Sequence, residues 1–176
     1  KKIILFGSMD GVNNFNKGWD LLSNALKIVQ DEISDCAALI FGQSYGNHSK
    51  EINMPVFYAG KLNDPQSLAM LYSTADITIV PSRIESFGQI ASESISCGTP
   101  VIAFKCTGLI DVVKNNNTGY LVEPYDCKKL GESIVELLKN KSTLEKFKLA
   151  CRKRAENLWS FEKVSKEYYK LYSKVL

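Results

Sequence analysis

Hydrophobic positions follow two alternating patterns along this chain. Short runs rich in Val, Ile and Phe, with little polar alternation, are typical of strands that are buried on both faces of a sheet. Six such runs occur, at residues 1–7, 36–42, 55–60, 76–80, 100–104 and 119–123. Between them, apolar residues recur every three or four positions, which predicts helices at residues 19–33, 65–74 and 89–97.

The pattern changes after Asp126, where the strand-like runs stop and three helices are expected at about 127–140, 142–157 and 160–175. Alternation of strands and helices predicts a doubly wound parallel α/β sheet, because each connection between parallel strands crosses a face of the sheet through a helix. We therefore predict one Rossmann-like domain over residues 1–176, with six parallel strands in the order 3-2-1-4-5-6 and a C-terminal helical extension.

Composition excludes several classes of protein. A chain of 176 residues with 45% hydrophobic and 23% charged residues is typical of one globular domain, which can fold without disulfides or metal. No apolar run approaches the roughly 18 residues of a membrane span. Five cysteines without any C-x-x-C spacing, and a single histidine, argue against a zinc site. We expect a reducing, cytoplasmic setting.

Charge gives weaker information about partners. The net charge of +3 is too small to favour nucleic acid. Residues 126–176 carry a net charge of +6, from 13 Lys and Arg against 7 Asp and Glu. This basic tail is expected to be a solvated helix surface, and it leaves open peripheral association with an anionic membrane surface, at the inner face of the membrane.

The loops that follow the strands contain the candidate chemistry, because ligands of such sheets bind at the carboxyl ends of the strands. The loop after the first strand, GSMDGVNNFNKGWD, ends in Lys17 and Gly18 at the start of a helix. A lysine beside a helix N-terminus suits a phosphate group. The alternative for Lys17 is a solvated lysine. The loop matches neither the dinucleotide fingerprint nor the P-loop.

The segment PSRIESFGQIASESISCGTP, residues 81–100, contains a second candidate site. Its helix should begin near Gly88, where free N–H groups face outward and the lack of a side chain lets a ligand approach the backbone. Glu93 could accept hydrogen bonds from two vicinal hydroxyls, such as those of a ribose. The alternatives are that Glu85 only stabilises the helix N-terminus and that Glu93 lies in solvent.

The motif ESFGQIASE reproduces the E-x7-E signature of a large family. Together with ILFGS…NKGWDLL, FYAGKLNDPQSLAMLYSTADITIVPS and LWSFEKVSKEYYKLY, it makes the whole chain resemble the C-terminal, nucleotide-sugar-binding half of a retaining glycosyltransferase of GT-B architecture, in the family 1 group of glycosyltransferases. The resemblance implies a nucleoside diphosphate sugar as donor, of the UDP or GDP type, with no metal or other cofactor. It also implies an N-terminal half, which lies outside this chain, as a partner.

The resemblance assigns catalytic roles to Glu85 and Lys17. Glu85 would face the hydroxyls of the donor sugar, and Lys17 would neutralise the diphosphate leaving group. Glu93 would bind the ribose.

The resemblance also implies contacts of the donor with the main chain of further residues. They are Gly7 beside the phosphates, Gly60, Lys61 and Leu62 along the base, and Ser86, Phe87, Gly88 and Gln89 around the distal phosphate. One position departs from the family, because Ser8 occupies the place of the usual Arg. Ser8 therefore puts tight donor binding in doubt.

These assignments imply an enzyme of polysaccharide or glycoconjugate synthesis that transfers a sugar to a glycan or lipid-linked acceptor. This chain alone would bind nucleotide without transferring sugar. The alternatives are a non-catalytic sugar-nucleotide-binding or assembly module, and a non-hydrolysing nucleotide-sugar epimerase. A dehydrogenase is the weakest alternative, because no glycine-rich fingerprint follows the first strand.

The last predicted helix has one apolar stripe, which consists of Phe161, Val164, Tyr168, Leu171, Tyr172 and Val175. In the family this helix packs partly against the other half of the enzyme. In this chain the stripe either folds onto its own domain or stays exposed.

Overall fold

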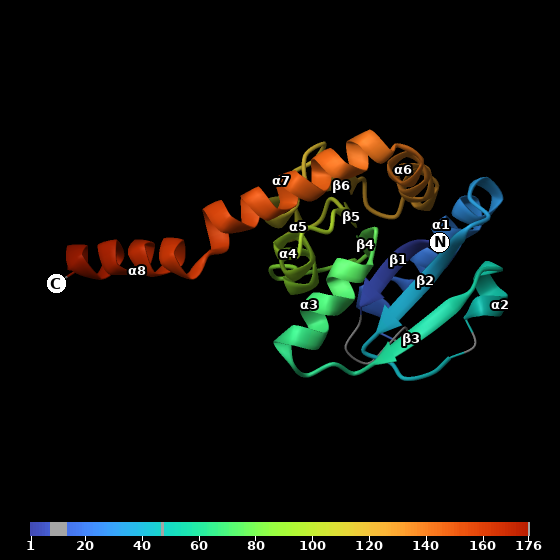
Figure 1. Cartoon of the computed structure of the whole chain (residues 1–176), viewed down its shortest axis with the longest axis horizontal. Coiled ribbons are helices and arrows are strands. Elements are labelled where there is room, and N and C mark those ends of the chain that lie inside the picture. Colours follow the sequence, from blue (N-terminus) through green and yellow to red (C-terminus); the bar gives the residue numbers. More distant parts are fainter. Residues whose placement is uncertain (8–13, 47, 176) are drawn as a thin grey trace.

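The computed structural model describes residues 1–7, 14–46 and 48–175. Its centre is a six-stranded parallel sheet with the strand order β3-β2-β1-β4-β5-β6, which confirms the predicted topology (Figure 1). The strands are β1 (Lys2–Gly7), β2 (Cys36–Phe41), β3 (Val56–Gly60), β4 (Ile77–Val80), β5 (Val101–Phe104) and β6 (Gly119–Val122).

The long helices begin and end within two residues of their predicted bounds. They are α1 (Trp19–Glu32), α3 (Pro65–Thr74), α4 (Gln89–Ser96), α6 (Cys127–Lys139), α7 (Lys141–Trp159) and α8 (Phe161–Val175). The sequence pattern missed three short elements, the 3-10 helix η2 (Phe15–Lys17), α2 (Ser49–Ile52) and α5 (Leu109–Val112), because a single turn shows no periodicity. Local capping fixes several helix starts; for example, the Asp64 side chain accepts a hydrogen bond from the Ser67 amide before α3.

Both faces of the sheet are covered, so successive residues of a strand contribute to different cores. In β1, Ile4 and Phe6 pack into the cluster formed with α1 and α6, whereas Leu5 packs with Leu71 and Tyr72 of α3. A third cluster joins β4 and β5 to α4 and α5. This double covering explains why the strands are almost continuously apolar.

The sheet diverges between β1 and β4. These two strands are hydrogen-bonded neighbours, yet the helix that follows β1 packs on one face of the sheet and the helix that follows β4 packs on the other. Such a divergence opens a crevice at the carboxyl ends of the two strands, where ligands of doubly wound sheets bind. The loops after β1 and β4 are the two loops that the sequence analysis selected as candidate sites.

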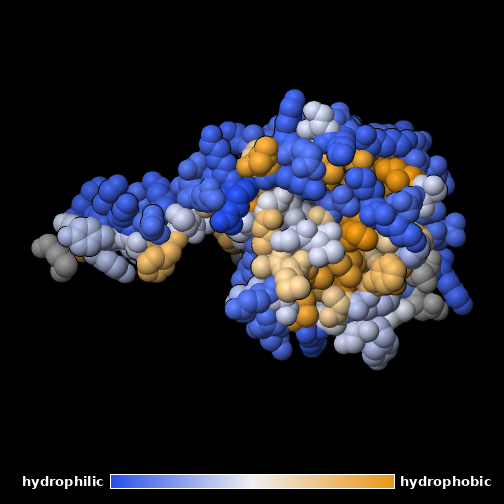
Figure 2. All heavy atoms as spheres, viewed as in Figure 1, coloured by the Kyte–Doolittle hydropathy of each residue, from blue (hydrophilic) through white to orange (hydrophobic). Residues whose placement is uncertain are grey.

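The last helix projects from the domain (Figure 1). No residue of Phe161–Val175 is buried, so its apolar stripe is exposed and does not fold onto its own domain. Figure 2 shows hydrophilic side chains along one edge of this helix, and a hydrophobic patch among paler, near-neutral side chains on the other. Among the helices described, none combines the length and the apolar character needed to cross a membrane.

Candidate functional site

Lys17 lies where the loop after β1 is fixed to the loop after β4. Gly18, directly after Lys17, has a φ of 71°, which favours glycine, and a Cβ at this position would overlap the carbonyl oxygen of Pro81. The Arg83 amide also donates a 2.9 Å hydrogen bond to the Asn16 carbonyl. These contacts bring the end of η2 against the segment that leads to α4.

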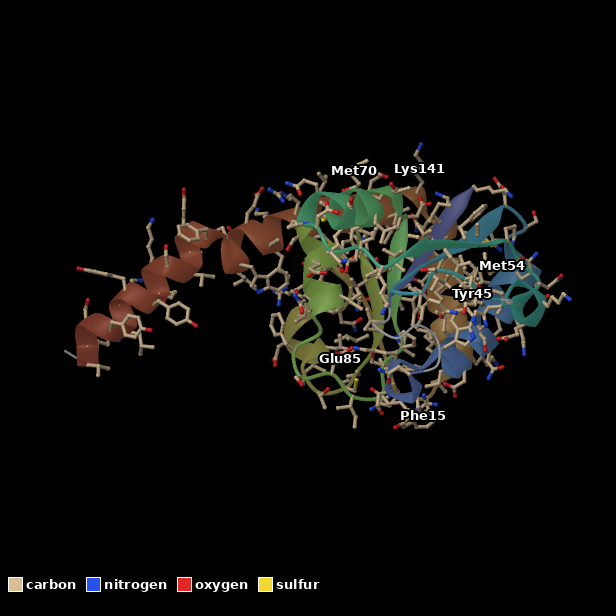
Figure 3. The ribbon with its side chains drawn as sticks, turned by 90° about the horizontal axis from the view of Figure 1, so that it is seen from below. Phe15, Tyr45, Met54, Met70, Glu85 and Lys141 are labelled. Atoms are coloured by element: carbon tan, nitrogen blue, oxygen red, sulfur yellow. The ribbon has the colours of Figure 1, made fainter. Side chains whose placement is uncertain are left out.

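Lys17 and Glu85 form an ion pair across the crevice. The Lys17 Nζ donates to the Glu85 Oε1, and the Ser82 hydroxyl donates to the same oxygen at 2.9 Å. The two side chains are only 22% and 13% exposed. Figure 3 shows Glu85 in the loop before α4, on the side of the molecule that also carries Phe15. The structure therefore brings together the two residues for which the family resemblance implies catalytic roles.

The backbone of Glu85 is held by the loop after β5. Its amide donates to the Thr107 Oγ1 at 2.9 Å, the Thr107 hydroxyl donates to its carbonyl at 2.6 Å, and the Gly108 amide donates to the same carbonyl at 3.0 Å. Thr107 has a φ of 35°, which is strained for a β-branched residue. The strain lies at the residue that fixes Glu85.

Arg83 clamps η2 to the same loop. Its guanidinium donates to both carboxylate oxygens of Asp20, at 3.0 and 2.6 Å, and lies 3.8 Å above the ring of Phe15. This hydrogen bonding lowers the pKa of Asp20 below its ordinary value of 3.8. Arg83 is thus a part of the frame, because its guanidinium donates to Asp20 and to the Phe15 carbonyl and lies against the Phe15 ring.

The N-terminus of α4 faces this crevice with unpaired amides. Gly88 precedes the helix with a φ of 89°, and no side chain in the described ranges caps it. The first intrahelical hydrogen bond of α4 is donated by the Ser92 amide to the Gly88 carbonyl, at 3.0 Å. The amides of Ser86, Phe87, Gly88 and Gln89 have no acceptor among the described residues. Free N–H groups at a helix N-terminus attract anions, phosphate above all.

Glu93 lies one helical turn further into α4. The hydroxyl of Tyr72 donates to its Oε2 at 2.8 Å. Burial, and then the charge of Glu93, raise the pKa of Tyr72, so its hydroxyl remains protonated and donates. The alternative in which Glu93 simply lies in solvent is therefore wrong.

Two cavities open on Glu93. The first, of about 270 Å³, is lined by Phe41, Gly42, Lys61, Leu62, Asn63, Leu68, Gln89, Ile90 and Glu93. The second, of about 440 Å³, is lined by Pro65, Leu68, Ala69, Tyr72, Phe87, Ser92, Glu93, Ser96, Cys97 and Trp159. The volume of the first cavity lies just below the range that is typical of small-molecule sites, and its lining mixes apolar with polar and charged side chains as theirs does. It combines four predicted site residues, Lys61, Leu62, Gln89 and Glu93.

The other predicted positions lie around this cavity. Gly60 is the last residue of β3 and directly precedes Lys61, which lines the smaller cavity. Gly7 is the last residue of β1 and lies against the ring of Phe41, another residue that lines this cavity. Ser8 lies outside the described residues. Within the part of the chain that the structure describes, no group of three or more His, Cys, Asp and Glu side chains could hold a metal ion.

Sequence reasoning missed residues that act through tertiary contacts. Tyr72 shares an apolar stripe with Leu68 and Leu71, so its spacing indicated only a core residue. Thr107 carries no local signal for its two bonds to Glu85. Phe41 could have been found, since it is the last side chain of the predicted strand 36–42, which is next to the central strand.

Known proteins share sequence or fold with this chain. The family described as glycosyl transferases group 1 matches residues 9–154. The chain is 28% identical to the capsular polysaccharide biosynthesis glycosyltransferase CapM of Staphylococcus aureus over 169 residues, which are 92% of this chain and 44% of that protein.

Two solved structures show the same fold. Sucrose-phosphate synthase from Thermosynechococcus elongatus has a TM-score of 0.82 and 28% identity, over 99% of this chain and 45% of that one. Anabaena HepE in complex with UDP and glucose has a TM-score of 0.80 and 18% identity, over 98% of this chain and 48% of that one. The chain therefore spans less than half the length of these proteins.

Proposed function

This chain belongs to the group 1 glycosyl transferases, and on that premise we propose that it is the donor-binding half of a retaining glycosyltransferase. The enzyme moves a sugar from a nucleoside diphosphate sugar to a glycan or lipid-linked acceptor. One observation carries the proposal: along the segment that enters α4, the unpaired amides of residues 86–89 follow Glu85, which is paired with Lys17, and precede Glu93. The group between a sugar and a ribose in such a donor is a diphosphate.

The donor fits the site from the ribose outward. Glu93 binds the ribose hydroxyls, and the cavity of about 270 Å³ beside it takes the base along Lys61 and Leu62. The amides of Ser86 to Gln89 bind the distal phosphate at the helix N-terminus. A donor of the UDP type is supported by the fold shared with HepE, which was solved with UDP and glucose.

The transfer step develops charge that this site can stabilise. As the bond from the sugar to the diphosphate breaks, the departing phosphate gains negative charge, and fixed donors aimed at that charge supply several kcal/mol in a cleft shielded from water. Lys17 and the amides of α4 are those donors, and Glu85 faces the sugar that becomes electron-deficient. Because this arrangement neutralises the leaving group with protein groups alone, activity is expected to persist in EDTA.

The other half of the enzyme packs against α8. The chain covers 44% of CapM, and the exposed apolar stripe of α8 needs a partner surface. Leu171, 56% exposed, tests this packing. The Leu171→Glu variant should lower the Tm of a longer protein with both halves and leave the Tm of the 176-residue chain unchanged. Equal effects in the two proteins would contradict it.

The biological setting follows from the relatives and from charge. CapM is named for capsular polysaccharide synthesis, which favours glycan synthesis for this protein as well. The net charge of +6 over residues 126–176 is that of a solvated helix surface, and it is compatible with work at an anionic membrane surface on the cytoplasmic side.

The test of the proposed function uses a longer protein that carries both halves. Incubated with UDP-sugars, it should hydrolyse or transfer one of them, and the first-formed product should keep the anomeric configuration by NMR. The 176-residue chain alone should transfer nothing. Binding of the donor without hydrolysis or transfer would instead identify a non-catalytic sugar-nucleotide-binding module, and an inverted product would exclude retention.

A further inference from the structure

Glu93 has open space on two sides. It lines both the cavity of about 270 Å³ beside Lys61 and the cavity of about 440 Å³ beside Trp159. A carboxylate between two cavities can turn toward either of them. Only one orientation binds the ligand, so the time spent in the other orientation lowers the apparent affinity. A ribose-binding Glu93 therefore needs a group that selects one orientation.

Among the described residues, Tyr72 is the side chain that hydrogen-bonds this carboxylate, and it lines the larger of the two cavities. Its hydroxyl donates to the Glu93 Oε2 at 2.8 Å, while its ring is only 1% exposed. This contact joins α3 to α4, 21 residues apart in sequence. A hydrogen bond to an ionised carboxylate is stronger than one between neutral groups. It leaves the Oε1, which has no hydrogen-bond partner among the described residues, available to a ligand.

The position of Tyr72 is itself fixed from two directions. The Thr99 hydroxyl, which is buried, donates to the Tyr72 carbonyl at 2.7 Å. The Tyr72 ring also meets the ring of Phe41 edge to face, at 5.7 Å and 82°, and Phe41 lines the smaller cavity. Tyr72 is therefore rigid enough to orient its neighbour.

We propose that Tyr72 is a positioning residue, whose hydroxyl orients Glu93 toward the smaller cavity and thereby makes this site selective for nucleotides that carry both ribose hydroxyls. The proposal rests on the proposed function, in which Glu93 binds the ribose. Tyr72 does not touch the nucleotide; it acts through Glu93. Phe at this position would keep the buried ring and its contact with Phe41, so the hydroxyl can be tested separately from packing.

The test is a double-mutant cycle on the 176-residue chain, with UDP and 2′,3′-dideoxy-UDP as probes in calorimetry. The Tyr72→Phe variant should bind UDP about tenfold more weakly and dideoxy-UDP within about twofold of the unchanged chain. In the Glu93→Ala background, Tyr72→Phe should have no further effect on UDP. The matched control is Tyr120→Phe, because the Tyr120 hydroxyl also donates to a glutamate, the Glu136 Oε1 at 2.9 Å, and should not change UDP binding.

The outcomes separate this inference from the proposed function. Equal weakening of both probes by Tyr72→Phe, unchanged UDP binding, or the same loss in the Glu93→Ala background would overturn the role of Tyr72. If the unchanged chain binds UDP and dideoxy-UDP alike, or binds neither, Glu93 does not read the ribose and the proposed function itself fails. Loss of selectivity in Glu93→Ala but not in Tyr72→Phe removes the positioning role alone.

Discussion

Lys17 and Glu85, 68 residues apart in sequence, are joined side chain to side chain across the point where the sheet diverges. Each partner neutralises the other in the free protein, and the Lys17 ammonium has two further N–H groups with which it can donate to a diphosphate while it stays paired with Glu85. The arrangement keeps both groups oriented in the free protein, because the frame of Gly18, Ser82 and Thr107 holds them in place. Such preorganisation lowers the cost of ordering the site when the donor binds.

Replacement of Lys17 should affect phosphate binding selectively. Lys17→Met keeps the length of the side chain and removes its charge, so UDP should bind about 10- to 100-fold more weakly, while uridine binds as before. Lys139→Met is the matched control, since Lys139 pairs with Glu32 at 2.6 Å on the surface. Calorimetric titration of both ligands measures the effect, and equal losses for UDP and uridine would mean that Lys17 does not meet the phosphates.

The close approach of Gly18 to Pro81 should matter for both stability and binding. Gly18 and Gly98 both have positive φ, 71° and 79°, but only Gly18 lies where a Cβ would overlap backbone. Gly98→Ala should cost about 1–2 kcal/mol, or roughly 2–8 °C in Tm. Gly18→Ala should cost more and, by displacing Lys17, should also weaken UDP binding.

Scanning calorimetry and UDP titration of the two alanine variants check this prediction. A Gly18→Ala variant that matches Gly98→Ala in both Tm and affinity would show that the contact with Pro81 does not position Lys17.

Acid should loosen the clamp between Arg83 and Asp20. Hydrogen bonding from Arg83 lowers the pKa of Asp20 below 3.8, so the clamp contributes stability at higher pH and loses it as pH falls below that value and Asp20 becomes protonated. The Asp20→Asn variant should therefore have a lower Tm than the unchanged chain at pH 6, and the difference should shrink as the pH falls from 4 to 3. A difference in Tm that stays constant over this range would contradict the assignment.

The fold could be predicted from the sequence because its signals are long and redundant. Six apolar runs without polar alternation indicated buried parallel strands, and their spacing left room for one crossover helix each. What escaped were elements of a single turn, η2 and α2 among them, whose structure depends on contacts such as that of Arg83 with Phe15. The exposure of α8 also could not be predicted from its apolar stripe. Such a stripe indicates that the helix is buried against something, but not whether its own domain or another one covers it.

The site could be predicted only in part. The spacing of Glu85 and Glu93 and the glycine between them gave the motif and the helix start. Glu85 is held by Thr107, from the loop after β5, and Glu93 is held by Tyr72, from α3. The sequence around Thr107 indicates only a loop, and the sequence around Tyr72 indicates only a core residue. Function at these positions arises from tertiary contacts, which a single sequence does not display.

The central claim is that the N-terminus of α4, with Glu93, binds a nucleoside diphosphate, and a thermal-shift panel of UDP, GDP and ADP tests it most directly. At 100 times its Kd, the preferred nucleotide should stabilise the chain by about 2.7 kcal/mol, a rise in Tm of roughly 5–10 °C. The rise should persist in Glu136→Ala, whose glutamate also accepts from a tyrosine, and vanish in Glu93→Ala. No rise with any nucleotide, or an equal rise in Glu93→Ala, would contradict the claim.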